Sequence, residues 1–161
     1  MGLRRNIGIV PIIGGALVII VVSFFMSILP TMTQPTTDLR IGDGIFNARV
    51  ATSDSDRTKG LGGVTKLGSD QALLMVFSSE DKWSIGMKDM KIPIDIIWLD
   101  SNKKVVYAVT DVSLDESASK VFTPKYPAMY VVELPAGTVG NKAINNASIA
   151  IFNIENVIRI K

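Results

Sequence analysis

A run of 23 residues near the start of the chain, residues 7–29, carries no charged side chain and is almost entirely apolar. As an α-helix it would be about 34 Å long, enough to cross a hydrocarbon core of about 30 Å. Arg4 and Arg5 precede the run, and the next basic residue is Arg40. Because basic residues flank the cytoplasmic side of membrane helices, we expect residues 1–6 in the cytoplasm and the chain after residue 29 outside it.

A cleaved signal peptide is the alternative interpretation of this run. Its apolar core would be about 7–15 residues long, with small residues at a cleavage site behind it. The run here is longer, and the sequence that follows, SILPTMTQPT, has no A-x-A pattern. We therefore favour an uncleaved single-pass transmembrane helix that places the protein in the cell membrane.

The rest of the chain divides into a short stalk and one domain. Residues 30–40 are rich in Thr and Pro, which predicts a stalk, and residues 41–161 are long enough to form a core of their own. All 15 acidic residues follow the apolar run, as do all but two of the 17 basic residues. The extracytoplasmic part is thus formally neutral, which argues against a nucleic-acid partner.

The sequence contains neither Cys nor His. This excludes disulfides, the usual zinc sites, a histidine general base and the Ser-His-Asp and Cys-His arrangements. Met87 and Met90 could ligate Cu(I) through their thioethers, but methionine is an ordinary core residue. We therefore expect no metal and no cofactor.

Short runs of β-branched and aromatic residues dominate the domain, and they predict strands. The predicted strands are a hairpin over 40–52 with its turn at Asp43-Gly44, followed by 72–77, 94–99, 104–109, 129–134, 148–154 and 156–160. One short helix is predicted within 52–63, with Ser53 near its start and Gly60 at its end, and another from Thr138. The expected fold is mainly β, a jelly-roll-like β-sandwich with one or two short helices.

Several blocks, in this order, resemble the bacterial and archaeal family of domains of unknown function numbered 192. They are Ala51-Thr52, Arg57 with Gly60-Leu61, Val76-Phe77, Met87-Lys88, residues 92–97 (IPIDII) with Asp100, and residues 130–137 (YVVELPAG). The resemblance covers roughly residues 45–151. It implies a jelly-roll-like β fold and no established activity. The chain departs from the family pattern at Gly62, Ile85-Gly86 and Asp89-Met90.

Asp95 lies between two isoleucines in an apolar run. Alternation along a strand puts it on one face with Ile97 and Leu99, so it should be buried and need a partner. Arg57 and Lys88 are the candidate cations, and the turn at Pro93 is the alternative. We interpret Asp95, together with Asp100 and Glu133, as structural buried charges, because such groups are more often structural than catalytic.

A surface near residues 57–62 and 83–91 is the predicted contact region. Trp83 follows the polar segment SSEDK and should be exposed, whereas Trp98 should be in the core. Arg57 could bind a carboxylate or phosphate, or instead tether its helix to the sheet. The residues proposed to contact a ligand or partner are Arg57, Trp83, Lys88, Asp89 and Lys91.

These observations favour a membrane-anchored extracytoplasmic binding or interaction module whose ligand is an envelope component. An accessory or structural subunit of a membrane protein complex is the alternative, in which the transmembrane helix, with Gly14 and Gly15, would be a main contact. A third possibility is a hydrolase-type enzyme that uses Asp95, Asp100, Glu133 and Lys88. Without His or Cys, we expect binding rather than catalysis.

Overall fold

The computed structural model describes residues 34–114 and 120–158, so the predicted transmembrane helix at residues 7–29 lies outside the described residues. None of the helices in the described ranges is long and apolar enough to cross a membrane. The described residues belong to one compact unit that starts at Gln34.

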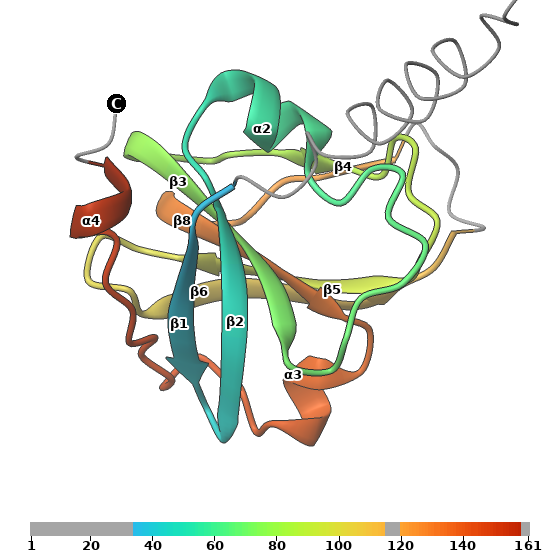
Figure 1. The fold of residues 1–161 in the computed structure, drawn as a ribbon. Helices are drawn as coiled ribbons and strands as arrows, with labels where there is room; N and C mark the ends of the chain where they lie inside the picture. The colour runs from blue at the N-terminus through green and yellow to red at the C-terminus, as the bar shows by residue number, and fades with distance from the viewer. Residues whose placement is uncertain (1–33, 115–119, 159–161) are drawn as a thin grey trace, which may run out of the picture. The chain divides into compact units, whose positions relative to one another are not determined.

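The domain is built mainly from β-strands (Figure 1). Six of them form one sheet in the order β1-β2-β3-β8-β5-β6, and the two short strands β4 and β7 form a second. The strands are β1 (Thr36–Ile41), β2 (Gly44–Ala51), β3 (Gln71–Asp81), β4 (Ile85–Gly86), β5 (Ile94–Leu99), β6 (Val105–Val112), β7 (Val121–Phe122) and β8 (Ala128–Pro135). The helices are α2 (Asp54–Lys59), α3 (Thr138–Asn141) and α4 (Glu155–Ile158).

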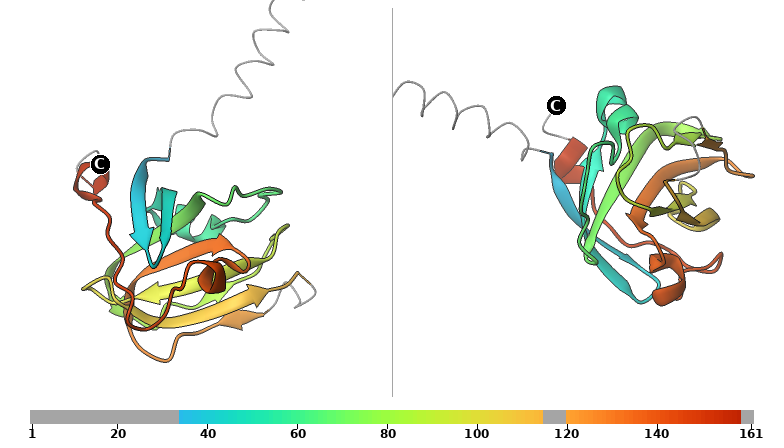
Figure 2. Two further views of the ribbon diagram at one scale, coloured as in Figure 1. Left: turned by 90° about the horizontal axis from the view of Figure 1, so that it is seen from below. Right: turned by 90° about the vertical axis from the view of Figure 1, so that its right-hand side faces the viewer.

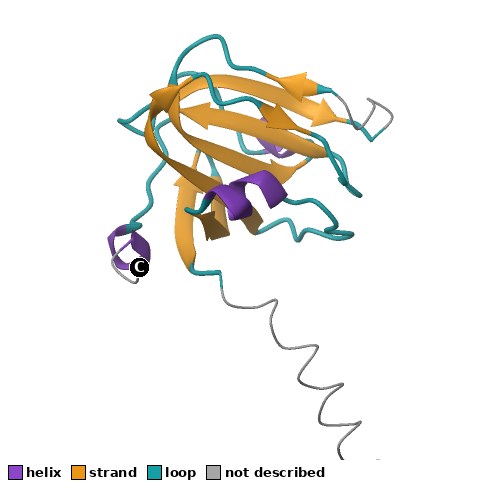
Figure 3. Ribbon diagram, turned by 90° about the horizontal axis from the view of Figure 1, so that it is seen from above, coloured by secondary structure: helices purple, strands orange, loops and turns teal. Residues whose placement is uncertain are grey.

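The six-stranded sheet is mixed. β2 and β3 run parallel, and every other neighbouring pair in it is antiparallel. Parallel neighbours need a crossover connection, and residues 52–70 provide it. Because α2 is part of this crossover, it lies against the sheet; in Figure 3, which looks down from above, it stands in front of the strands.

One C-terminal segment joins the two edges of this sheet. Ile151 exchanges two backbone hydrogen bonds with Arg40 of β1, at 2.9 and 2.8 Å. Earlier in the same segment, the Ala150 N–H donates to the Lys103 carbonyl at 2.9 Å, and the Ser148 carbonyl accepts the N–H of Val105, the first residue of β6, at 3.0 Å. The sheet therefore curls until its edges are bridged, which gives a barrel-like shape (Figure 2).

The two faces of the sheet carry separate cores. The inner core draws on all six strands and includes Leu39, Phe46, Leu74, Ile97 and Val132. The outer core covers the opposite face of β3, β5 and β8, where Leu73, Ile96, Trp98 and Val131 pack against Leu61, Ile85 and Met87 from the segments that cross over it. Because both faces are covered, β5 is buried along its whole length, Asp95 included.

Much of the predicted layout is confirmed. The fold is mainly β with short helices; the hairpin turns between Ile41 and Gly44, and β5 has the predicted bounds. Both helices form where expected: the side chain of Ser53 accepts the backbone N–H of Asp56 at 3.1 Å, and Gly60 ends α2. The jelly-roll arrangement is not confirmed, because six of the strands belong to a single mixed sheet that contains a parallel pair.

Four details differ from the predictions. Residues 36–40, assigned to the stalk, form most of β1. Residues 148–154 alternate between buried and exposed as a strand would, but they form only single bridges because they cross between two sheet edges. The strand predicted at 156–160 is wrong in its described part, which is helix α4, preceded by a hydrogen bond from the Glu155 N–H to the Asn153 side chain at 2.9 Å. The two-residue strands β4 and β7 are too short to leave a sequence pattern.

Candidate functional site

Three adjoining hollows surround α2, and together we call them the α2 cleft. The first, of about 340 Å³, is lined by Phe77 and Trp83. The second, of about 300 Å³, shares Arg57, Met75 and Ile85 with the first and reaches Glu133. The third is an open groove of about 650 Å³ on the far side of Lys59. The cleft thus lies where α2 and its following loop meet β4, which is the surface predicted from the sequence.

Arg57 fixes the position of α2. Its Nη1 donates to the backbone carbonyls of Thr52 at 2.6 Å and Val76 at 2.7 Å, and its Nη2 pairs with Asp54. The guanidinium group also lies 5.0 Å above the ring of Phe77. These contacts tether α2 to the sheet, which is one of the two roles expected for Arg57. They use backbone carbonyls and Asp54, not the carboxylates of Asp95, Asp100 or Glu133.

Trp83 forms one wall of the cleft. Its ring stacks on Phe77 with centroids 4.2 Å apart and planes 11° from parallel, and its Nε1 donates to the Ser79 carbonyl at 3.1 Å. The predicted exposure is only partial, since the residue is half-buried. Trp98 lies in the outer core, as expected, and its Nε1 donates to the Trp83 carbonyl at 2.8 Å. Trp83 is therefore held in place through its ring, by Phe77 and Ser79, and through its backbone carbonyl, by Trp98.

Glu133 forms the floor of the second cavity. The residue is 2% exposed, and its Oε2 has no hydrogen-bond partner among the described residues. Burial raises the pKa of this carboxyl group to about 7, although a hydrogen bond from the Leu61 backbone and the nearby charge of Arg49 act in the opposite direction. A buried oxygen without a partner is costly, so it marks a place where a ligand atom would be favoured.

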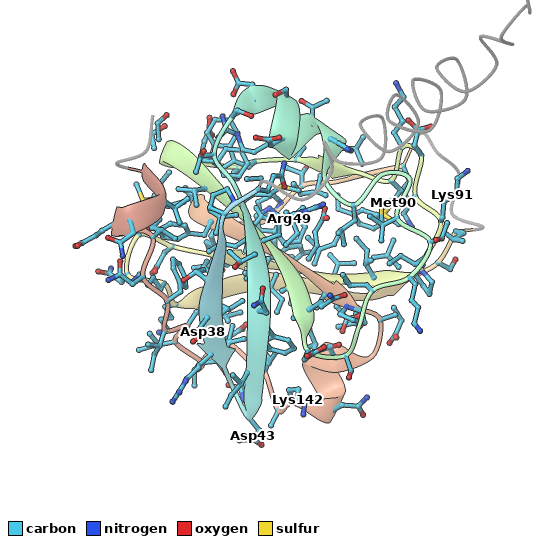
Figure 4. The ribbon with its side chains drawn as sticks, in the orientation of Figure 1. Asp38, Asp43, Arg49, Met90, Lys91 and Lys142 are labelled. Atoms are coloured by element: carbon cyan, nitrogen blue, oxygen red, sulfur yellow. The ribbon has the colours of Figure 1, made fainter. Side chains whose placement is uncertain are left out.

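Gly60 lies beside this carboxyl group, and its backbone rather than the space around it favours glycine. A Cβ atom at this position would make ordinary van der Waals contacts, 3.5 Å from both carboxyl oxygens of Glu133 and 3.4 Å from Cε of Met75. The backbone has φ +52° and ψ −132°, a conformation that residues with a side chain rarely adopt. Arg49 Nη2 donates to the Gly60 carbonyl at 2.9 Å, which joins β2 to the same corner (Figure 4).

Two lysines stand at the mouth of the second cavity. Lys59 and Lys88 are both exposed and line it, and neither ammonium group makes a hydrogen bond or ion pair with a described residue. Asp89 lines only the neighbouring groove, where its carbonyl accepts the Gly63 N–H at 2.9 Å. Lys91 is exposed and lines none of the three hollows that form the cleft (Figure 4).

The two methionines considered as copper ligands have different surroundings. Met87 is buried in the outer core, whereas Met90 is half-buried and lines the cavity above Glu133. Across the described ranges, no group of three or more Asp or Glu side chains is arranged to hold a metal ion.

Asp95 is fully buried, and it shares the inner face with Ile97 and Leu99 as predicted. Its described partners are three backbone N–H groups: Asp111 at 2.8 Å and Gly137 at 3.2 Å on Oδ1, and Val139 at 2.7 Å on Oδ2. The predicted cation partners are therefore wrong within the described residues, because Arg57 is held elsewhere and Lys88 is exposed. Three N–H donors can stabilise a buried carboxylate without a cation.

The carboxyl groups considered for hydrolysis do not converge. Asp95 pairs with Leu134 and Glu133 with Ile96 in the β5–β8 ladder, so the two acids point to opposite faces of the sheet. Asp100 is only partly buried, and its Oδ1 accepts the N–H groups of Asn102 and Lys104, both at 2.9 Å, in the turn before β6. Of this set, only Lys88 and Glu133 line one cavity.

Sequence reasoning missed two features of the site. Arg49 had no predicted role, and Glu133 was grouped with the structural acids. The register explains both, because Arg49 and Glu133 are each opposite Leu73 of β3 and so lie in one row across the sheet. No local pattern indicates a pairing between strands that are so far apart in the chain.

The fold and the cleft define a mainly β domain with a ligand-sized hollow beside its crossover helix. Residues 37–148, more than half of the chain, match the model of DUF192, a family described as uncharacterised ACR. The chain therefore belongs to the DUF192 family.

Two crystal structures have a similar fold. A candidate transcription regulator from Sinorhizobium meliloti 1021 superposes with a TM-score of 0.70 at 18% identity, over 74% of this chain and 95% of that one. A protein of unknown function from Novosphingobium aromaticivorans DSM 12444 gives 0.70 at 17% identity, over 76% and 89%. No curated protein matches the chain. At these identities the likeness concerns the fold alone.

Proposed function

We propose that the protein is a membrane-anchored binding module outside the cytoplasm, and that the α2 cleft takes its ligand, a component of the cell envelope. The single observation that carries this proposal is Oε2 of Glu133, a buried oxygen without a described partner at the floor of a cavity of about 300 Å³. Pockets with a few convergent polar groups and a shifted pKa are the first candidates for a binding site.

The construction of the cleft supports binding rather than a packing defect. Arg57 and the Phe77–Trp83 stack hold its walls, and Gly60 leaves open the space that a side chain would fill. Lys59 and Lys88 present free charges at the entrance. Such preorganisation lowers the entropy cost of binding.

The proposed location depends on the sequence of residues 1–29. The uncharged run at 7–29 and the preceding Arg4 and Arg5 support an N-terminal transmembrane helix with the domain outside. Extraction of membranes with alkaline carbonate tests this part: the full chain should stay in the pellet, and release into the supernatant would contradict a transmembrane helix.

Affinity capture of the full chain from gently solubilised membranes tests the cleft. A cleft variant, Lys59→Glu with Lys88→Glu, should lose the co-purifying envelope component. A control variant, Lys66→Glu with Lys104→Glu, carries the same charge change on exposed lysines outside the cleft and should retain it. A component that survives the cleft variant but is lost when residues 1–33 are removed would contradict the proposal and favour an accessory subunit of a membrane complex.

A further inference from the structure

The charges around the Glu133 carboxyl group indicate what kind of ligand fits beside it. On the sheet, its neighbours at the same register on β3 and β5 are the apolar Leu73 and Ile96. From β2, Arg49 acts on it through its positive charge. From α2 and the loop after it come Arg57, Lys59 and the Leu61 N–H, and from the segment after β4 comes Lys88. Among the described residues, no second acid lines the cavity beside this group.

The lining of the second cavity is positive apart from its floor. Arg57, Lys59 and Lys88 line it, and Glu133 is its one acid among the described residues. Arg57 is already occupied by Asp54 and two carbonyls, but both lysines are free of described partners. The acids Asp54 and Asp89 belong to the adjoining hollows instead. A ligand in this cavity therefore meets two unpaired ammonium groups.

The remaining lining limits the size and polarity of the ligand. Leu61, Met75, Ile85 and Met90 give the cavity apolar walls. Its volume of about 300 Å³ is at the lower end of the range of about 300–1,000 Å³ for ligand pockets. This space suits a small molecule with an apolar body.

We propose that this cavity binds a small organic anion with an apolar body, held by Lys59 and Lys88 at the mouth and by a hydrogen bond from the carboxyl group of Glu133 at the floor. The inference rests on the proposed function, because it names the ligand class of the same cleft. Charge-assisted bonds from lysine and an O–H donor are stronger than bonds between neutral groups.

The carboxyl group of Glu133 donates only while it carries its proton. A pKa of about 7 keeps much of it protonated in weakly acidic surroundings, whereas the ionised form would repel an anion. Affinity for an anion should therefore fall as pH rises. A ligand that donates to the ionised carboxylate would show the opposite dependence.

Benzoate and benzamide form a matched pair of probes, since they share shape and apolar body and differ in charge. Calorimetric titration of the full chain in lipid nanodiscs, with empty nanodiscs as the blank, should show benzoate binding at least about tenfold more tightly than benzamide. Between about pH 6 and about pH 8, benzoate affinity should fall by about tenfold, because the protonated fraction of Glu133 falls by that factor. Benzoate itself stays ionised throughout this range.

Three variants locate the effect. The cleft variant Lys59→Glu/Lys88→Glu should weaken benzoate binding by at least about tenfold, and the control variant Lys66→Glu/Lys104→Glu should leave it unchanged. Glu133→Gln keeps an N–H donor at the floor, so it should bind benzoate with no pH dependence over this range.

Several results would overturn the inference: absence of benzoate binding, equal or tighter binding of benzamide, affinity that rises with pH, or equal loss in the cleft and control variants. None of these results changes the outcome of the affinity capture, in which the intact cleft retains the envelope component. The titration therefore tests the ligand class, and the capture tests the proposed function separately.

Discussion

The carboxylate of Asp95 in β5 accepts a hydrogen bond of 2.7 Å from the backbone N–H of Val139 in α3, 44 residues later in the chain. Its other oxygen accepts the N–H groups of Asp111 and Gly137. One buried side chain thus connects β5 with β6 and with the chain around α3. It accepts backbone N–H groups at the start of α3 that would otherwise have no hydrogen-bond partner.

We predict that Asp95→Asn destabilises the domain by about 2–3 kcal/mol. Asparagine keeps one acceptor oxygen and turns an NH₂ group toward a backbone donor, so buried N–H groups lose their partner. Asp100→Asn is the matched control: both hydrogen bonds of Asp100 use Oδ1, which the amide oxygen replaces, and the change should stay below about 1 kcal/mol. Urea unfolding of the full chain in mild detergent measures both, and equal losses would contradict the structural role of Asp95.

Gly60 and Gly86 line the same cavity but differ in backbone conformation, which makes them a second matched pair. Gly60→Ala should cost about 1–3 kcal/mol, because the positive φ at this position is strained for any residue with a side chain. Gly86 lacks a positive φ and has no atom within 4 Å of an added Cβ, so Gly86→Ala should change stability by less than about 0.5 kcal/mol. Thermal unfolding distinguishes the two variants, and a Gly60→Ala protein as stable as wild type would count against this account of the α2 terminus.

The buried Glu133 predicts a stability that falls as pH rises. Its pKa is about 7 in the folded chain against an ordinary value of 4.5, so between these pH values the unfolded chain has released the proton while the folded chain still holds it. The contribution of the neutral carboxyl group is therefore fully present below about pH 4.5 and lost above about pH 7. The loss amounts to about 3 kcal/mol.

Glu133→Gln isolates this effect because glutamine does not titrate. The unfolding free energies of the wild type and the variant are measured in urea at several pH values. Because the two proteins have every other titrating group in common, the pH dependence of their difference comes from Glu133. The variant should gain stability relative to the wild type from pH 5 to pH 8, by up to about 3 kcal/mol. A difference between the two proteins that stays constant with pH would show that Glu133 ionises as it does in the unfolded chain.

Asp95 and Glu133 illustrate how far the sequence alone reaches. Both are single acids in apolar strand runs, IDIIWL and VVELP, and both are buried as predicted. The two acids differ in what lies against their side chains. Backbone N–H groups around α3 contact Asp95, whereas Glu133 faces a cavity beside Gly60. These surroundings come from segments about 40 to 70 residues away, so no local pattern encodes them.

The same limit applies to the sheet. Local signals located the hairpin, β5 and both short helices, because caps and alternation act within a few residues. The bridging of β1 and β6 by residues 148–151 depends on curvature that accumulates over six strands. For this reason a segment with a strand-like sequence forms only isolated bridges instead of a regular strand. The predicted contact surface coincides with the α2 cleft, and that it contacts a ligand stays a prediction. Glu133, at the floor of the second cavity, was assigned to the structural acids.

Hydrogen–deuterium exchange on the full chain, with and without its co-purifying envelope component, tests most directly the claim that the α2 cleft is the binding site. The account predicts that the component slows exchange in residues 57–62 and 83–90. A separate groove, lined by residues 105–108 and 144–147, shares no residue with the α2 cleft, and its exchange should stay unchanged. Protection confined to this separate groove, with exchange around α2 unaltered, would contradict the account.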